Sequence, residues 1–312
     1  MNKLNTSISP HIRNDHSTAG IMIDVIIALI PALLASVFWF GFRALYITGI
    51  CVLTCVLGEL AFQLITKRDI TIGDFSAVVT GMILAFNLPV TIPEWQAIIG
   101  SLVAIVVVKQ LFGGIGFNFA NPAATARVMM LVSFSGTMTR WTAPKSADLV
   151  SAATPLALMG EGNTEALPSL FKMMIGERAG SMGETCAVAM VFGFVYLLAR
   201  KVITWHTPVI FVGTAFVFTY LATGLDAGGA VYHIFSGGLL FGAVFMATDY
   251  ATTPSRSWGK VIFAIGCALI TVAVRLWGSN PEGVSFAILF MNILTPYISR
   301  LTRHRIFGAK KA

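Results

Sequence analysis

A short apolar segment in the first third of the chain ends with the run Thr80-Gly81-Met82-Ile83-Leu84-Ala85-Phe86-Asn87-Leu88-Pro89. Counted from Phe75, the segment would cover about 22 Å as an α-helix. The hydrocarbon core of a bilayer is about 30 Å thick, so a helix of this length is too short to cross it. Asn87 and Pro89 end the helix, which makes the segment both short and interrupted.

The composition around this segment is that of a polytopic membrane protein. Of the 312 residues, 56% are hydrophobic and 11% are charged, whereas soluble domains carry about 25% charged residues. The net charge of +7 does not indicate nucleic-acid binding, because the basic residues lie between apolar segments and at the C-terminus. The four cysteines lie in apolar runs without flanking ligands, which favours packing over metal binding.

Ten apolar segments can be marked along the chain, and the third and the eighth are the short ones. Their approximate bounds are 21–40, 44–66, 75–89, 95–112, 122–135, 184–199, 205–223, 234–247, 258–277 and 281–299. We therefore expect an all-α integral membrane protein with about ten transmembrane segments, two of them short and broken. The expected divisions are a polar cytoplasmic lead (1–20), a first five-helix repeat (21–135), an extracytoplasmic loop (136–183), a second five-helix repeat (184–299) and a basic cytoplasmic tail (300–312).

The two halves resemble each other in the order and length of their segments and in two dipeptides. Asn121-Pro122 before the fifth segment corresponds to Asn280-Pro281 before the tenth, and Thr80-Gly81 corresponds to Ser236-Gly237. Because each half has an odd number of segments, the halves must insert with opposite orientations, as a 5+5 inverted repeat. Short, interrupted segments at matching positions of such repeats indicate a binding site near the middle of the membrane.

The distribution of basic residues predicts the orientation of the chain. With the N-terminus inside, 15 of the 21 Lys and Arg residues fall on the cytoplasmic side and 6 fall on the outer side. Positive residues are retained in the cytoplasm, so this asymmetry predicts that both termini are cytoplasmic and that residues 136–183 are extracytoplasmic.

Some polar features lie inside or beside the apolar segments. The turn Gly113-Gly114-Ile115-Gly116 lacks the ending of a P-loop, and it either joins packed helices tightly or lines a site. Asp24, Glu59 and Asp249 are acids in apolar surroundings, where a charge costs about 2.5–3.5 kcal/mol on insertion scales. Glu59 or Asp249 could serve the passage of a cation. A helix–helix hydrogen bond or an interfacial carboxylate is the plainer interpretation, above all for Asp24.

The longest polar interval contains the run Asp148-Leu149-Val150-Ser151-Ala152-Ala153-Thr154-Pro155. The plain interpretation is a short helix that begins at Pro155 with Thr154 as its cap. The functional alternative is that the Thr154 hydroxyl carries a cofactor through a phosphoester. Arg140 and Lys145 lie in the same interval and could neutralise such a phosphate. Trp141 could stack on a ring or belong to an interfacial aromatic belt.

Three sets of residues together make the sequence similar to the NqrB/RnfD family, a family of membrane proteins from ion-translocating oxidoreductases that includes RnfD of the Rnf complex. The sets are Gly113-Gly114-x-Gly116 with Asn118 and Asn121-Pro122-Ala123-Ala124, Phe245-Met246-Ala247-Thr248-Asp249 followed by Pro254, and Pro281-Glu282-Gly283-Val284-x-Phe286-Ala287 with Asn292. No single set is specific, but the combination is, and the resemblance extends over essentially the whole chain.

The resemblance implies a covalent flavin. In the family, the threonine of the motif Asp-x-x-Ser-Gly-Ala-Thr carries FMN through a phosphoester bond. The motif matches this sequence at Asp148, Ser151, Ala153 and Thr154, and Ala152 stands where the family has glycine. The resemblance therefore predicts that Thr154 is the attachment point.

The resemblance also implies a second flavin and a set of partners. The paralogue holds a non-covalent flavin such as riboflavin, for which Asn121, Thr248 and Asp249 would be walls, with Glu59 as a further candidate for the ion path. The family works in the cell (inner) membrane with the other subunits of the Rnf complex (A, B, C, E and G). That complex moves electrons between ferredoxin and NAD and couples this to Na⁺ or H⁺ translocation. The alternative function is a channel or carrier of ammonium- or urea-channel-like architecture without redox activity, because fold alone does not fix function.

Overall fold

The computed structural model describes residues 17–145, 152–278 and 282–303, and within these ranges it contains helices and no strand. The first half holds α1 (Thr18–Phe40), α2 (Phe42–Ile65), η1 (Ile72–Asp74), α3 (Ser76–Phe86), α4 (Glu94–Leu102), its π-helical continuation η2 (Val103–Gln110), α5 (Pro122–Ser133) and α6 (Ser135–Met138). The middle holds α7 (Pro155–Gly160), η3 (Thr164–Ala166) and α8 (Leu170–Ile175). The second half holds α9 (Ala187–Ala199), α10 (His206–Ala222), α11 (Ala227–Phe235), α12 (Leu239–Phe241), the π-helical η4 (Gly242–Met246), α13 (Ser257–Trp277) and α14 (Val284–Leu301).

Four helices, α1, α2, α13 and α14, are each long and apolar enough to cross a membrane. The pair formed by α11 and α12–η4 is bent by 65° and makes a fifth crossing if its two limbs act together. The eighth segment, expected at 234–247, is mostly the second limb of this pair, because the chain breaks at Ser236–Gly238 and the first limb begins at Ala227. The chain is thus an all-helical, multi-pass membrane protein, and ten crossings stay a prediction.

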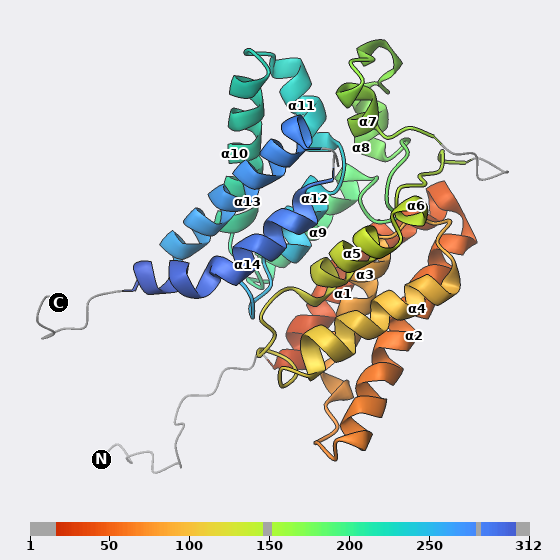
Figure 1. The fold of residues 1–312 in the computed structure, drawn as a ribbon, viewed down its shortest axis with the longest axis vertical. Helices are drawn as coiled ribbons and strands as arrows, with labels where there is room; N and C mark the ends of the chain where they lie inside the picture. The colour runs from red at the N-terminus through yellow and green to blue at the C-terminus, as the bar shows by residue number, and fades with distance from the viewer. Residues whose placement is uncertain (1–16, 146–151, 279–281, 304–312) are drawn as a thin grey trace, which may run out of the picture.

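The helices lie in two groups that follow the order of the chain. Figure 1 shows α1–α5, in red to yellow, on one side and α10–α14, in green-blue to blue, on the other. In the first group α2 packs on α3 and α4, and in the second α13 packs on α10 and α14. The groups are joined where α9 packs on α1 and α14 packs on α5.

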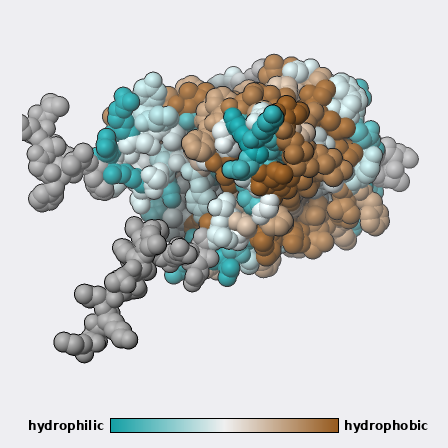
Figure 2. Space-filling view, turned by 90° about the horizontal axis from the view of Figure 1, so that it is seen from below, coloured by the Kyte–Doolittle hydropathy of each residue, from teal (hydrophilic) through white to brown (hydrophobic). Residues whose placement is uncertain are grey.

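The outer surface of the helices is strongly apolar. Leu34, Phe38, Phe42 and Ile65 on α1 and α2 are between 63% and 81% exposed. Figure 2 shows hydrophobic side chains over a wide area of one face, interrupted by smaller hydrophilic patches. Apolar patches of this extent are rare on soluble monomers, so the surface is suited to contact with lipid chains or with other membrane helices.

The chain between α8 and α9 runs through the interior. Residues 178–185 are all buried. Their amides bind carbonyls at the interrupted end of α3: Gly183 N donates to Phe86 O at 2.9 Å, and Met182 N donates to Leu88 O at 3.1 Å. Backbone groups at membrane depth need partners, and this buried loop supplies them where α3 stops.

Two arginines stabilise the break between α11 and α12. Arg275 donates to the carbonyls of His233 and Ser236, and Arg178 donates to the carbonyl of Phe235. Both arginines are less than 10% exposed. The last carbonyls of a helix have no partner within the helix. The two guanidinium groups therefore donate hydrogen bonds to carbonyls that the break would otherwise leave unpaired.

Candidate flavin and ion sites

A cavity of about 110 Å³ lies between the two groups of helices. Most of its walls are apolar, and its polar lining consists of Ser76, Thr80, Lys109, Asn118, Asn121, Thr248, Asp249 and Tyr250. Sites for small organic ligands have mostly apolar walls and a few polar groups, and the cavity has a lining of this kind. It brings together three of the residues that the sequence assigned to a second flavin or an ion path, Asn121, Thr248 and Asp249.

Asn121 forms hydrogen bonds with both halves of the chain at one wall of this cavity. Its side-chain oxygen caps α5 by accepting from the amides of Ala123 and Ala124, each at 3.1 Å. Its side-chain nitrogen donates to the carbonyl of Met246, at the end of η4, at 3.2 Å. The amide of Asn292 lies 3.0 Å from Asn121 N, so all three sequence sets behind the family resemblance meet here.

Asp249 lies directly after η4, and its carboxylate is fixed within its own turn. Thr252 Oγ1 donates to one oxygen at 3.0 Å, and Ala251 N lies 3.3 Å from the other. Burial raises the pKa of Asp249 above its ordinary value, although the hydrogen bonds from Thr252 and Ala251 oppose the shift. A carboxylate held in this way at the edge of a cavity can bind either a proton or a cation.

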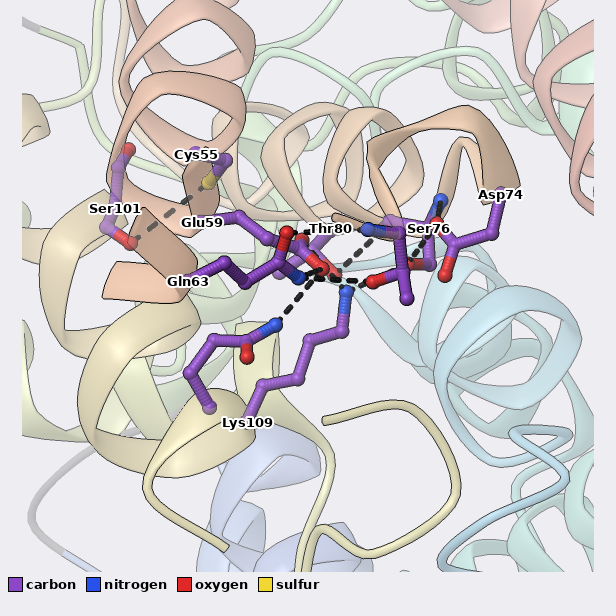
Figure 3. Close-up of polar contacts among 10 residues, drawn as sticks. Cys55, Glu59, Gln63, Asp74, Ser76, Thr80, Ser101 and Lys109 are labelled. Carbon is purple, nitrogen blue, oxygen red and sulfur yellow. Dashed lines mark hydrogen bonds and ion pairs between the residues drawn. The ribbon is translucent and has the colours of Figure 1, made fainter. Parts of the chain in front are cut away.

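Glu59 lies outside the cavity, at the centre of a hydrogen-bonded group shown in Figure 3. Lys109 Nζ lies 2.9 Å from one carboxylate oxygen, and the side-chain nitrogens of Gln110 and Gln63 lie 2.8 and 3.3 Å from the other. Glu59 is 1% exposed and Lys109 is 3% exposed. A buried ion pair of this kind needs every remaining polar group satisfied, and the two glutamines satisfy the second oxygen of Glu59.

Lys109 connects Glu59 to the cavity. Its ammonium group also donates to Ser76 Oγ at 2.6 Å, and both Lys109 and Ser76 line the cavity whereas Glu59 does not. Lys109 comes from the last turn of η2, and π-helical turns are frequent at functional sites. The structure therefore links Glu59 to the cavity residues through a single side chain that the sequence placed only at the end of an apolar segment.

Thr154 is the N-cap of α7. Its hydroxyl oxygen accepts from Ala157 N at 3.2 Å, and Pro155 occupies the first helical position. The plain interpretation of this stretch is therefore confirmed, and Thr154 is only 8% exposed. Ala153 is described and is exposed, whereas Asp148 and Ser151 lie outside the described residues.

Lys145 and Trp141 of this interval contact different parts of the chain. The ammonium of Lys145 lies 4.3 Å from the ring centre of Phe38 and 4.7 Å from that of Trp39. Trp141 is buried, and its carbonyl accepts from Ala152 N at 2.9 Å. Lys145 thus makes cation–π contacts with two aromatic rings. Because Trp141 is buried, its position does not favour a place in an interfacial aromatic belt.

Asp24 makes a structural contact between α1 and α9. Its carboxylate accepts from Tyr196 Oη at 2.9 Å and from Arg200 Nε at 3.1 Å. The interpretation of Asp24 as a helix–helix contact is therefore confirmed.

The sequence did not predict a second buried group of charges, which is formed by Arg127, Arg178, Glu184, Arg275 and Glu282. Of the five, only Glu282 was named from the sequence, as part of one of the three sets behind the family resemblance. A usable signal was present, because Arg127 and Arg275 stand within apolar segments, where a charge needs a partner.

The fold and the cavity define a class of protein: a multi-pass helical membrane protein with interrupted helices around an internal site. The chain belongs to the NQR2, RnfD, RnfE family, whose model matches residues 5–308.

Similar proteins cover the chain almost from end to end. The D subunit of the Na⁺-translocating ferredoxin:NAD⁺ oxidoreductase complex of Acetobacterium woodii is 47% identical over 100% of this chain and 98% of its own length. The D subunit of the proton-translocating ferredoxin:NAD⁺ oxidoreductase complex of Clostridium ljungdahlii is 39% identical over 98% of this chain and 96% of its own. The D subunit of the ion-translocating oxidoreductase complex of Stutzerimonas stutzeri is 36% identical over 94% of this chain and 92% of its own.

Proposed function

We propose that the chain is the D subunit of a ferredoxin:NAD⁺ oxidoreductase complex that couples electron transfer to the translocation of Na⁺ or H⁺. The observation that carries the proposal is 47% identity over the whole chain to a protein of that name. Relatives named for Na⁺ and for protons are both similar to the chain, so the proposal covers either ion. The channel or carrier alternative has no support among these relatives, which are named as oxidoreductase subunits.

Within such a complex, Thr154 would carry FMN through a phosphoester, and the flavin would supply one- and two-electron chemistry. The hydroxyl oxygen of Thr154 accepts a hydrogen bond from Ala157 N, and an ester oxygen can still accept that bond. Because the side chain is 8% exposed, the attaching enzyme would have to act before α7 packs. Asp148 and Ser151, which complete the motif with Ala153, stay predictions.

The cavity between the two groups of helices is the proposed place of a second, non-covalent flavin such as riboflavin, and the walls would have to move apart to admit it. Val79, Ile83 and Phe245 line it and could cover the faces of a ring system. Asn118 and Lys109 could donate hydrogen bonds to the polar edge of the ring. The role of the chain would be to orient the ring and to exclude water from it.

The proposed ion path uses Glu59 and Asp249. Lys109 relates the two acids, because it pairs with Glu59 and lines the same cavity as Asp249. An ion that binds Glu59 would have to displace the ammonium of Lys109. Charge rearrangement around the cavity would thereby change the affinity of Glu59 for a cation.

The proposed topology has ten crossings in a 5+5 inverted repeat, both termini in the cytoplasm and residues 136–183 outside the cell membrane. It is supported by an interrupted segment in each half, at the end of α3 and between α11 and α12. The proposed partners are the lipid bilayer and the other subunits of the Rnf complex (A, B, C, E and G).

The test is to separate the capping role of Thr154 from the attachment role. Thr154→Asn keeps a capping side chain but cannot form the phosphoester, and Thr139→Ala removes an exposed hydroxyl as a control. We expect Thr154→Asn to fold with no covalent flavin fluorescence in a denaturing gel, whereas Thr139→Ala keeps it. Both should release the same non-covalent flavin on denaturation. A Thr154 peptide with its plain amino-acid mass, in protein from cells that contain the attaching enzyme, would refute the covalent site.

A further inference from the structure

A second group of buried charges lies between the two halves, apart from the cavity that Asn121, Thr248 and Asp249 line. Arg127 of α5 forms an ion pair with Glu282, which precedes α14, and its guanidinium lies 4.0 Å from Glu184 Oε2. Arg127 also donates to Asn87 Oδ1 at 2.6 Å, which fixes its orientation. The side chains of Arg127, Glu184 and Glu282 are 5%, 3% and 15% exposed. Two carboxylates from distant parts of the chain therefore share one guanidinium group in the protein interior.

Two other cations face this pair of carboxylates without binding them. Arg178 of the buried loop and Arg275 of α13 direct their hydrogen bonds to backbone carbonyls, including those of the α11–α12 break. Their charges reduce the cost of negative charge nearby. They do not hydrogen-bond to the carboxylate oxygens of Glu184 or Glu282.

A small cavity of about 10 Å³, which is room for about one water molecule, adjoins the pair, with Asn87, Arg127, Gly238, Glu282, Val284 and Ser285 as its lining. Glu184 Oε2 lies close to one of these lining residues, because a methyl group placed on Gly238 would lie 2.7 Å from this oxygen. Within the described part of the chain, Glu184 Oε2 accepts no hydrogen bond. Buried polar atoms are nearly always satisfied, so this oxygen indicates that a proton or a donor-bearing ligand belongs beside it.

We propose that Glu184 and Glu282 form a proton-binding site, which holds one exchangeable proton on the carboxylate pair and exchanges it through the small cavity that adjoins them. A hydronium ion that enters the cavity would transfer its proton to a carboxylate oxygen. One O–H bond breaks in the hydronium, one forms on the carboxyl group, and a water molecule remains. Two buried carboxylates that share one cation bind a proton as a coupled pair.

A proton fits this site better than a metal cation does. The guanidinium of Arg127 faces both carboxylates and would repel a second cation between them. The cavity offers few further oxygen ligands, because Asn87 Oδ1 already accepts from Arg127. Burial raises the pKa of Glu282 from 4.5 to about 7, and the carboxylate of Glu184 adds to the shift, while Arg127 and Arg275 oppose it. The carboxyl group of Glu282 is therefore set for proton exchange near neutral pH.

The site lies beside the helix that begins after Thr154. Leu156 of α7 would lie 2.6 Å from a methyl group on Gly237, and Gly238 lines the cavity. A proton bound by Glu184 and Glu282 would reduce the net negative charge of the protein beside α7. The inference concerns only side chains of this chain, so it holds whether or not Thr154 carries a flavin.

The test is infrared difference spectroscopy of the full chain, purified in its complex, over a pH series. A protonated carboxylic acid has a carbonyl stretch that is separate from that of a carboxylate and shifts to lower frequency in D₂O. We expect such a band in wild-type protein to disappear with a midpoint near pH 7. Glu282→Gln and Glu184→Gln, which mimic the neutral acid in shape, should each abolish it. Glu94→Gln, at a half-exposed surface ion pair, should leave it unchanged.

Glu282→Asp is the control for loss of the band through a structural change, because this variant keeps a carboxyl group that can bind the proton. In that variant the carboxylic-acid band should persist, and the pH at which half of it has disappeared should differ from that of wild-type protein. The proposal is overturned if wild-type protein lacks the band, or if both glutamine variants keep it. It is also overturned if the midpoint moves when Na⁺ replaces choline at constant ionic strength, because Na⁺ rather than a proton would then be the ligand.

Discussion

Lys109 and Glu59 are each other's only charged partner within hydrogen-bonding distance among the described residues, and both are almost completely buried. Removing one member of a buried ion pair leaves an uncompensated charge, which costs about 3–5 kcal/mol. We expect Lys109→Met to lower the free energy of unfolding by about that amount, as measured by the unfolding midpoint in detergent. Combining it with Glu59→Gln should cost less than the two single changes added together. Additive losses would show that the two side chains do not depend on each other.

Glu282 should make the stability of the fold depend on pH. Its pKa is raised from 4.5 to about 7 in the folded protein, mainly by burial, so the folded state binds the proton more tightly than the unfolded state. The stabilisation is complete below pH 4.5 and is lost as the pH rises to about 7. We expect unfolding midpoints of wild-type protein to fall over this range and those of Glu282→Gln to fall less. An identical slope in both proteins would contradict the assignment.

Among the elements, the buried loop 178–185 depends on a glycine where it meets α3. A Cβ on Gly183 would overlap the Cβ of Phe86, whose carbonyl accepts from Gly183 N. Forcing atoms into a packed interior costs about 1–3 kcal/mol. We expect Gly183→Ala to destabilise the protein by an amount near the upper end of this range. Gly213→Ala on α10, where a Cβ would meet nothing within 4 Å, should be neutral or stabilising. Equal midpoints for the two variants would rule out this role of the loop.

The sequence predicts elements well where hydrophobicity alone determines them. The segment expected at 205–223 is α10 (His206–Ala222), and the one expected at 21–40 is α1 (Thr18–Phe40). It does not predict the limb Ala227–Phe235, because the break after that limb is stabilised by Arg178 and Arg275 from elsewhere in the chain. Interruptions at membrane depth depend on partners that are distant in sequence.

The same limit applies to the sites. Asn121, Thr248 and Asp249 were expected together because they belong to recognisable sequence sets, and they share one cavity. The link from Glu59 to that cavity could not be read from the sequence, because it depends on the direction of one side chain, Lys109. The Arg127 group was missed for a related reason, since its members come from separate segments of the chain.

At the scale of the whole molecule, the two helix groups meet at polar groups and pack apolar surfaces outward. The cavity lined by Asn121 and Asp249 and the group of charges around Arg127 both lie where the halves join. Buried polar groups at a junction favour a defined arrangement of the halves only while every group stays satisfied. Changes in charge at this junction are therefore the events most able to shift one half against the other.

The orientation of the whole chain can be measured with single cysteines. Cys51, Cys55 and Cys267 are buried and Cys186 is half-buried, so Cys186→Ala provides a background with little reactive thiol. Glu161→Cys, at the end of α7, and Arg300→Cys, near the end of α14, place exposed thiols on sides that the basic residues predict to be opposite. A membrane-impermeant maleimide should label Glu161→Cys in intact spheroplasts and Arg300→Cys only after permeabilisation. Labelling of both before permeabilisation would mean that the loop and the C-terminal helix end on the same side. That result would exclude both the inverted repeat and an outer location for Thr154 with a cytoplasmic C-terminus.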